Sequence, residues 1–177
     1  MKTYIGFFRG INVGGKNILP MKDLVNILEC LGCTNVRTYI QSGNGVFRSK
    51  ETDRLSLART ISAGIYKERG FKPTVLLLEP VELQKAADNN PFETENGKAL
   101  HFFFLHSPPQ KPSAEQLSAV KSASEQFKLT KNVFYLFAPE GIGRSRLAAR
   151  VEQILGVEAT ARNWNTVSKL LDLARQI

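Results

Sequence analysis

The sequence predicts an α+β protein of two ferredoxin-like (βαββαβ) units, packed into one two-lobed body and followed by a C-terminal helix. Three observations support this fold class. The N-terminal half runs strand, helix, strand, strand, helix, strand, which is the split βαβ order. The C-terminal half repeats that order. The 177 residues also suit two units small enough to need shared burial. We expect a first unit over residues 1–79, a helical connector over 80–97, and a second unit with the C-terminal helix over 98–177.

The first predicted elements are a strand, a loop and a helix. Residues 2–8 are rich in β-branched and aromatic side chains, which favours a strand. Residues 10–17 are rich in glycine and asparagine and predict a loop. Pro20 suits the first turn of a helix, and apolar side chains recur at helical spacing after it. Gly32 stands where the C-cap of that helix is expected.

A hairpin and a second helix are expected next. Residues 35–40 and 46–47 predict two strands, and the Asn44–Gly45 step between them is a tight-turn signal. Thr52 is expected to cap the second helix, which ends at Gly70 because glycine is the usual residue after a helix.

An uninterrupted apolar run over residues 72–78 completes the first unit and favours a strand in the middle of its sheet. The second half follows the same order. Its expected elements are a connector helix over 80–89, a strand over 100–105, a helix over 113–127 opened by a capping box of Ser113 and Gln116, a strand over 132–137, a short strand over 141–143, a helix capped by Ser145, a strand over 157–160, and a terminal helix starting at Asn165 or Thr166.

Basic residues are concentrated near the N-terminus. The chain has a net charge of +8, and residues 1–50 hold seven Lys and Arg against two Asp and Glu. This asymmetry predicts an anionic partner, either nucleic acid or a phosphorylated small molecule. A basic excess that only serves solubility is the alternative.

The composition excludes several classes of protein. No stretch approaches the roughly 20 apolar residues of a membrane helix. The N-terminus lacks the apolar core and cleavage site of an export signal, and two cysteines make no disulfide framework. We therefore expect a cytoplasmic protein with no membrane partner, and the sequence leaves the oligomeric state open.

The sharpest local pattern is the loop from Gly10 to Lys16, which matches G-x-x-x-x-G-K. A working P-loop also needs a hydroxyl group on magnesium, and Asn17 supplies none. Residues 18–20 separate Lys16 from the predicted helix, so the helix N-terminus cannot lie directly beneath the loop. These departures disfavour a working P-loop, and two other interpretations stay open beside it. The glycine amides and Lys16 form an anion-binding nest, or the segment is only a glycine-rich turn between a strand and a helix.

Cysteine and histidine indicate no metal site. Cys30 and Cys33 form C-x-x-C at the C-terminal end of a predicted helix, where the helix dipole disfavours a thiolate. His101 lies within a predicted strand. His106 is followed by Ser107, but no Cys or carboxylate lies beside it in the sequence to suggest a triad. We expect no metal and no cofactor, and the sequence assigns no catalytic residue.

Polar residues gather at the predicted ends of elements, where binding sites often form. They are Arg9, Asn12 and Lys16 in the first loop, Gln41, Ser42 and Asn44 in the hairpin, Arg144, Ser145 and Arg146 at a helix start, and Arg162, Asn163 and Trp164 before the terminal helix. The Arg-Ser-Arg group suits phosphate through free amides and guanidinium groups, or Ser145 simply caps the helix between solvated arginines. Trp164 either stacks on a base or anchors the terminal helix.

Five ordered segments give the chain a resemblance to a known family. They are Arg9–Asn17, Tyr39–Asn44, Asn90–Phe92, Ser145–Leu147 and Ala161–Val167. Over essentially the whole chain they resemble the bacterial proteins of unknown function grouped as DUF1697. The resemblance implies two ferredoxin-like units and no established activity. It also implies that a shared site would lie at the motif positions, which are Arg9, Asn12, Gln41, Ser42, Asn44, Arg162, Asn163 and Trp164.

The chain departs from the family pattern at two positions. Gly45 stands where an apolar strand residue is usual, so the third strand is expected to start later or to carry a bulge. Arg146 replaces a common Lys. That change keeps the charge but puts lysine-specific chemistry, such as a Schiff base, in doubt.

Three functions fit these observations. The leading hypothesis is a binding module for a phosphate-bearing ligand, such as a nucleotide or single-stranded nucleic acid. Its roles are phosphate contact for Arg9, Lys16, Arg144 and Arg146, hydrogen-bond specificity for Asn12, Gln41 and Asn44, and base stacking for Trp164. The second hypothesis is an enzyme acting on a phosphorylated or acyl substrate, with Ser42 or Ser145 as nucleophile. The third is a structural or protein-interaction role in which the clusters are caps and turns.

Overall fold

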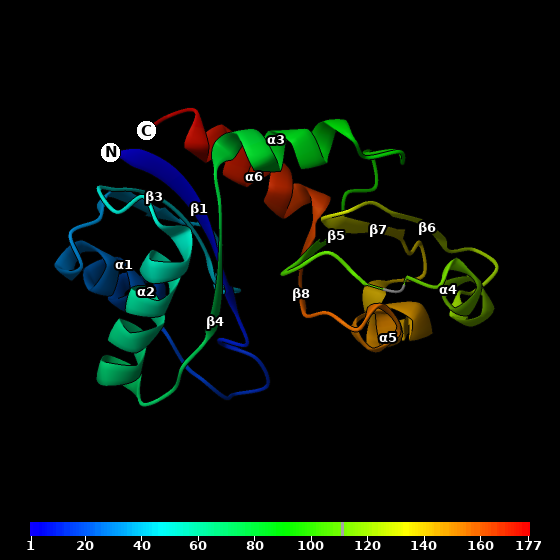
Figure 1. The fold of residues 1–177 in the computed structure, drawn as a ribbon, viewed down its shortest axis with the longest axis horizontal. Coiled ribbons are helices and arrows are strands. Elements are labelled where there is room, and N and C mark those ends of the chain that lie inside the picture. The colour runs from blue at the N-terminus through cyan, green and yellow to red at the C-terminus, as the bar shows by residue number, and fades with distance from the viewer. Residues whose placement is uncertain (111) are drawn as a thin grey trace. The chain divides into compact units, whose positions relative to one another are not determined.

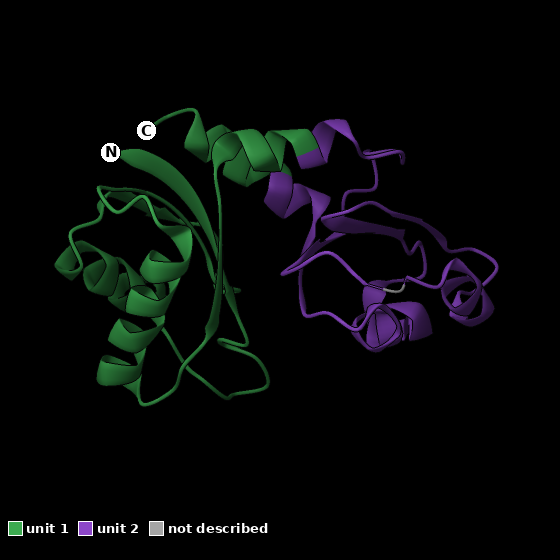
Figure 2. Ribbon diagram, in the orientation of Figure 1, with its two compact units in different colours: residues 1–85, 168–177 green, residues 86–167 purple. Residues whose placement is uncertain are grey.

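The computed structural model describes every residue except 111. By its contacts the chain divides into unit 1, Met1–Lys85 with Ser168–Ile177, and unit 2, Ala86–Val167 (Figure 2). Each unit contains one four-stranded antiparallel sheet with flanking helices (Figure 1). The predicted α+β fold of two similar ferredoxin-like units is confirmed. This division places residues 80–85 and 168–177 with the first unit.

Unit 1 has the sheet order β2-β3-β1-β4, with all neighbours antiparallel. Because β1 lies between β3 and β4, the unit has the split βαβ topology. Its elements are β1 (Lys2–Arg9), α1 (Met21–Cys30), β2 (Thr34–Thr38), β3 (Asn44–Ser49), α2 (Arg54–Arg69), β4 (Thr74–Leu78) and most of α3 (Pro80–Asp88).

Unit 2 repeats this topology with the order β6-β7-β5-β8. Strand β5 takes the central place that β1 has in unit 1. The elements are β5 (Leu100–Leu105), α4 (Ala114–Val120), β6 (Gln126–Leu129), β7 (Val133–Phe137), the 3-10 helix η1 (Ile142–Arg144), α5 (Arg146–Leu155), β8 (Ala159–Asn163) and the start of α6 (Trp164–Ala174).

The core of unit 1 lies between its sheet and helices α1 and α2. Alternate residues of β1, Tyr4 and Phe8, are fully buried against apolar side chains of both helices. The intervening residues Ile5 and Phe7 point to the opposite face, because side chains alternate along a strand, and they are also fully buried. Strand β1 is therefore paired at both edges and buried on both faces.

The core of unit 2 is built in the same way. Helices α4 and α5 pack on one face of the sheet through residues such as Leu117 and Val151. The opposite face carries an aromatic group: the ring of Phe102 lies 5.0 Å from Tyr135 in edge-to-face contact and 5.8 Å from Trp164 in stacked contact. Such pairs add to the stabilisation that burial alone provides.

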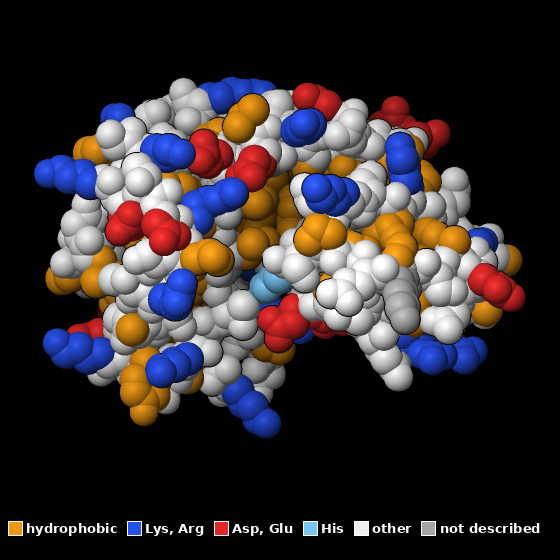
Figure 3. Space-filling view, viewed as in Figure 1, with side chains coloured by type: hydrophobic (Ala, Val, Ile, Leu, Met, Phe, Trp, Pro, Cys, Tyr) orange, Lys and Arg blue, Asp and Glu red, His pale blue; other side chains and the backbone are white. Residues whose placement is uncertain are grey.

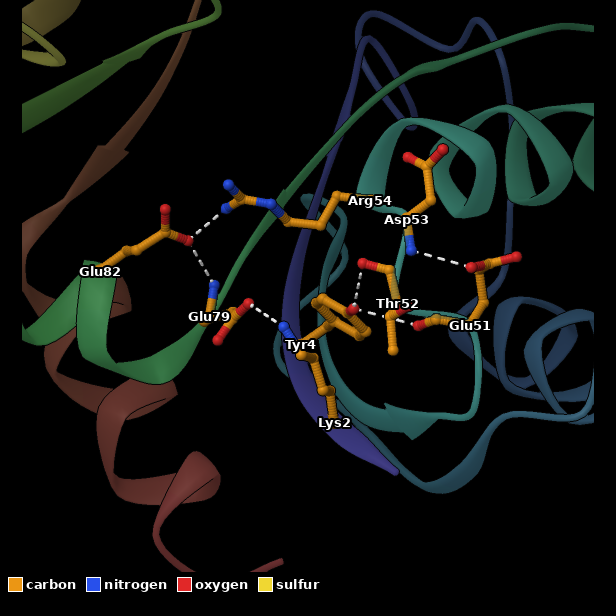
Figure 4. A network of polar contacts seen from close by, with 8 residues as sticks. All are labelled: Lys2, Tyr4, Glu51, Thr52, Asp53, Arg54, Glu79 and Glu82. Carbon is orange, nitrogen blue, oxygen red and sulfur yellow. Dashed lines mark hydrogen bonds and ion pairs between the residues drawn. The ribbon is translucent and has the colours of Figure 1, made fainter.

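Polar contacts join α3 to the rest of unit 1. The hydroxyl of Tyr4 donates to the backbone carbonyl of Glu51 at 3.0 Å, and burial raises the pKa of that phenol (Figure 4). Two ion pairs lie beside it, Lys2 with Glu79 and Arg54 with Glu82. They fix where α3 begins relative to β1 and α2.

Three expectations for unit 1 were wrong. Strand β4 lies at the edge of the sheet, because an apolar run reports burial of both faces and says nothing about which edges are paired. Asn44 and Gly45 belong to β3, where Gly45 pairs with Gly6 in regular register, so neither a later start nor a bulge occurs there. The register shift lies in the pairing of β2 with β3. Asp53, rather than Thr52, caps α2, and its carboxylate accepts from the amides of Leu55 and Ser56 in the first turn.

Unit 2 differs from expectation in three places. The helix predicted over residues 113–127 ends at Val120, and Phe127 belongs to the short strand β6. Residues 141–143 form no strand, because the segment from Ile142 is a 3-10 turn. The last strand starts and ends later than predicted, so Arg162 and Asn163 lie in β8, and α6 begins at Trp164.

Substituting Tyr135 tests the packing of unit 2. Its hydroxyl donates to the carbonyl of Ala86 at 2.7 Å, and burial raises its pKa to about 12. Tyr135→Phe should lower the free energy of unfolding by about 1 kcal/mol at neutral pH, because it leaves that buried carbonyl without its donor. Between pH 10 and 12 the unfolded wild type loses this proton while the folded protein keeps it. Wild-type stability should therefore fall by up to about 1.4 kcal/mol more per pH unit than that of the variant.

Urea unfolding at neutral and alkaline pH measures both effects. Tyr66→Phe is the matched control, since that ring is 51% exposed. A stability gap between wild type and Tyr135→Phe that stays constant above pH 10 would contradict the assignment.

Candidate functional site

The glycine-rich loop that leaves β1 is a tight hairpin. Lys16 donates its backbone amide to the carbonyl of Val13 at 3.0 Å, which closes a turn over residues 13–16. The two central residues, Gly14 and Gly15, have φ of 56° and 74°. Positive φ at both central positions is the signature of a type I′ turn. The segment therefore projects a two-residue tip and does not wrap a phosphate as a P-loop does.

The side chain of Asn12 ties this hairpin to the rest of unit 1. Its Nδ2 donates to the carbonyls of Leu19 and Gln41, both at 2.8 Å, and its Oδ1 accepts from the amide of Leu19 at 2.8 Å. Asn17 adds a second tie by donating to the carbonyl of Gly10 at 2.9 Å. Both asparagines have positive φ, which asparagine tolerates better than most residues.

The β2–β3 turn meets the same region. The amide of Phe8 donates to the carbonyl of Gly43 at 2.9 Å. A Cβ on Gly43 would lie 2.6 Å from the Phe8 carbonyl oxygen, so only glycine permits this approach. Asn44 is fully buried, and its Nδ2 donates to the Tyr39 carbonyl and the Ser42 hydroxyl. We call residues 10–19 and 39–44 together the loop cluster.

The loop cluster is free of carboxylates. Residues 1–22 and 30–50 contain no Asp or Glu. Unit 1 as a whole has 15 Lys and Arg against 8 Asp and Glu, a net charge of +7 out of the +8 of the chain. Lys16 is exposed and forms no ion pair within the described part of the chain. The basic character inferred from the sequence therefore belongs to unit 1, which contains Arg9 and Lys16.

The candidate group at the start of α5 lies in unit 2. Ser145 is buried, and its hydroxyl accepts from the amide of Ala148 at 2.9 Å, so the capping interpretation is confirmed. Arg144 and Arg146 on either side are exposed. Ser145 has no histidine or carboxylate partner among the described residues, so the structure provides no general base for it.

The last predicted group also lies in unit 2, on β8 and α6. Burial lowers the pKa of Arg162 to about 10, and its guanidinium donates to the carbonyl of the preceding residue at 2.8 Å. The side chain of Asn163 accepts from the amide three residues on and caps α6. Trp164 stacks on Phe102, which supports the interpretation of this ring as an anchor of the helix.

Sequence reasoning missed a polar group on the β5–β8 edge. His106 Nε2 lies 2.9 Å from the Thr160 hydroxyl, and Nδ1 lies 3.6 Å from a Glu158 carboxylate oxygen. The order hydroxyl, imidazole, carboxylate is that of a nucleophile with its base. Thr160 is only 1% exposed, however, so a substrate cannot reach its hydroxyl. The group instead joins the end of β5 to the start of β8. The strand register that places His106 opposite Glu158 is the only signal that could have revealed it.

A groove of about 440 Å³ runs between α1 and α2. Ile27 and Leu31 line it, and it is narrow at Gly64, where a Cβ would lie 3.2 Å from Leu31. The ion pair of Asp23 with Arg69 lies at its rim. None of the sequence-predicted site residues lines this groove.

Cys30 is exposed and Cys33 is buried, both thiols are free, and burial raises the pKa of Cys33. No three His, Cys, Asp or Glu side chains come together as metal ligands among the residues that the structure describes. In the same part of the chain, every helix is too short or too polar to cross a membrane.

Asn12 can be tested as the residue that holds the loop cluster together. Asn12→Ala removes three hydrogen bonds and should lower the free energy of unfolding by about 2–4 kcal/mol. Asn12→Gly loses the same bonds but accepts φ of 53° without strain, so it should be about 1 kcal/mol more stable than the alanine variant. Urea unfolding measures both values. Two variants as stable as wild type would show that the loop cluster does not depend on this amide.

Comparison with known proteins places the chain in a family. The family described as a protein of unknown function (DUF1697) matches residues 1–135. A conserved bacterial protein, SP0830 from Streptococcus pneumoniae, has a similar solved structure, with a TM-score of 0.72 and 23% sequence identity over 97% of this chain and 98% of that one. No curated protein matches the sequence. At this identity the structural likeness shows a shared fold. Since the family match covers most of the chain, the protein belongs to the DUF1697 family.

Proposed function

We propose that unit 1 binds a phosphate-bearing anion, such as a nucleotide or single-stranded nucleic acid, at the loop cluster. The observation that carries the proposal is the hairpin tip, where two successive glycines are directly followed by the exposed Lys16. The amides of Gly14 and Gly15 donate no hydrogen bond within the described part of the chain. Two free amides beside a cation are the donors that proteins use for phosphate oxygens.

The second support is the rigidity of the loop cluster. Asn12 and Asn17 fix the base of the hairpin through side-chain hydrogen bonds, and Gly43 holds the neighbouring turn against β1. A ligand that binds there does not have to order the loops, which lowers the entropic cost of binding. The absence of carboxylates from both loops removes like-charge repulsion with an anion.

The charge distribution favours a local site over a long track. On the face of unit 1 that Figure 3 shows, acidic side chains are interspersed among the basic ones, and the basic ones form no continuous stripe. A ligand that spans a few phosphates fits this pattern better than a long duplex does. Arg144 and Arg146 of unit 2 stay predicted phosphate contacts, and the proposal does not depend on them.

Removing the charge of Lys16 tests the proposal. Lys16→Ala should weaken the binding of inorganic tripolyphosphate by about fivefold to tenfold at low salt, because it removes the exposed cation beside the glycine amides. Isothermal titration calorimetry measures the dissociation constant. Lys67→Ala is the matched control, since Lys67 is another exposed lysine of unit 1, on α2. The proposal fails if wild type binds no tripolyphosphate, or if both variants lose the same affinity.

A further inference from the structure

Three aliphatic side chains of the loop cluster are exposed to solvent. The exposed fractions are 66% for Val13, 53% for Ile18 and 51% for Ile40. Single exposed aliphatic residues are normal on protein surfaces, whereas a group of them marks an interaction site. These three residues mark such a site if they lie close together in the structure.

The hydrogen bonds of Asn12 bring the backbones of the three residues close together. Val13 directly follows Asn12, Ile18 directly precedes Leu19, and Ile40 directly precedes Gln41. Leu19 and Gln41 both accept from the same amide nitrogen of Asn12 at 2.8 Å. Since neighbouring Cα atoms are about 3.8 Å apart, the backbones of all three aliphatic residues lie near the Asn12 side chain. Lys16 belongs to the hairpin that starts at Val13.

The backbone of Ile40 points to a functional reason for this patch. Its φ is 48°, in a region that β-branched residues rarely occupy. The side chain is half exposed, so burial offsets little of the resulting strain. Asparagine or glycine would fit the same backbone with less strain. Strain that the fold does not require is typical of binding sites.

The chemistry of the patch selects one kind of partner. Aliphatic side chains beside a cation, with no carboxylate in either loop, suit a molecule that offers both phosphate and apolar ring faces. Single-stranded nucleic acid offers both, because its bases are unstacked and accessible, whereas a duplex hides them. A bare polyphosphate would use Lys16 and leave the aliphatic group in water. The large exposed fractions also argue against a small molecule, which needs an enclosed pocket.

We infer that the loop cluster binds single-stranded nucleic acid, with a phosphate on Lys16 and the Gly14–Gly15 amides and with bases packed on Val13, Ile18 and Ile40. This inference rests on the proposed function, since it names the class of phosphate-bearing ligand for the same site. Phosphate contact alone would give a basal affinity. Contact of the bases with the three aliphatic side chains raises the affinity above that value.

Two labelled oligomers of equal length separate the contributions. One is an oligothymidylate and the other is an abasic oligomer with the same phosphates, and fluorescence anisotropy at low salt measures both dissociation constants. Wild type should bind the oligothymidylate about tenfold more tightly, because bases that pack on the aliphatic side chains remove apolar surface from water. Ile18→Ser and Ile40→Asn should each reduce this ratio severalfold and leave binding of the abasic oligomer unchanged.

Two controls separate loss of base contact from loss of folding and from a general effect of removing an exposed aliphatic side chain. Ile40→Asn should keep or raise the melting temperature, since asparagine relieves the strain at φ of 48°, so a lost ratio cannot come from misfolding. Leu55→Ser and Val81→Ser change aliphatic residues of unit 1 that are 70% and 67% exposed outside the loop cluster, and they should leave the ratio unchanged.

Each other outcome has a defined meaning. If wild type binds both oligomers equally, or if Leu55→Ser lowers the ratio as Ile40→Asn does, the inference is overturned while phosphate binding stands. If neither oligomer nor tripolyphosphate binds, the proposed function itself fails. Oligoglutamate of equal charge and unlabelled oligothymidylate can be compared as competitors of the labelled oligothymidylate. If both displace it at the same concentration, the surface recognises acidic peptide and the inference is likewise overturned.

Discussion

The rest of unit 1 depends on the position of β1 in its sheet. The strand is hydrogen bonded to β3 at one edge and to β4 at the other, and residues on both of its faces are fully buried. A shift by one residue would exchange the two buried faces, so its register is strongly determined. The strand therefore ends at a defined place, and the glycine hairpin starts there. The turn before β3 is bonded to the same end of β1, through Phe8 and Gly43, which explains why two distant segments form one loop cluster.

Much of the polar sequence of the candidate site serves the backbone. Loops that leave a sheet must satisfy amide and carbonyl groups that no strand neighbour reaches. Asn12 and Asn44 do this in unit 1, and Ser145 and Asn163 cap helices in unit 2. These side chains are committed to internal bonds. The groups left for a ligand in the loop cluster include the charge of Lys16, the Gly14 and Gly15 amides, the exposed Gln41 side chain and the exposed aliphatic side chains, and the proposed chemistry follows from this division.

Two units with one topology do not carry two copies of one site. The segment after β1 has paired glycines and forms a hairpin, whereas the segment after β5 has prolines at 108 and 109, which cannot adopt that turn. At the end of β5 the chain has His106, bonded to Thr160, where the end of β1 has Arg9. The common architecture thus explains the two cores, and the different loops explain why only unit 1 has the glycine hairpin.

Local sequence patterns determined the fold of this protein. Periodic apolar residues gave the helices their buried faces, and Gly70 and Gly156 ended α2 and α5 in the left-handed conformation that glycine favours. These signals depend on residues that are close together in the sequence, so the sequence alone is enough to predict them. The short strand β6 escaped prediction because four residues of mixed polarity also continue a helical pattern. Tertiary structure alone decided that β4 is an edge strand, that Asn12 bonds to Gln41, and that His106 meets Thr160. Each of these depends on the register between segments far apart in the chain, and register follows from packing of the whole unit.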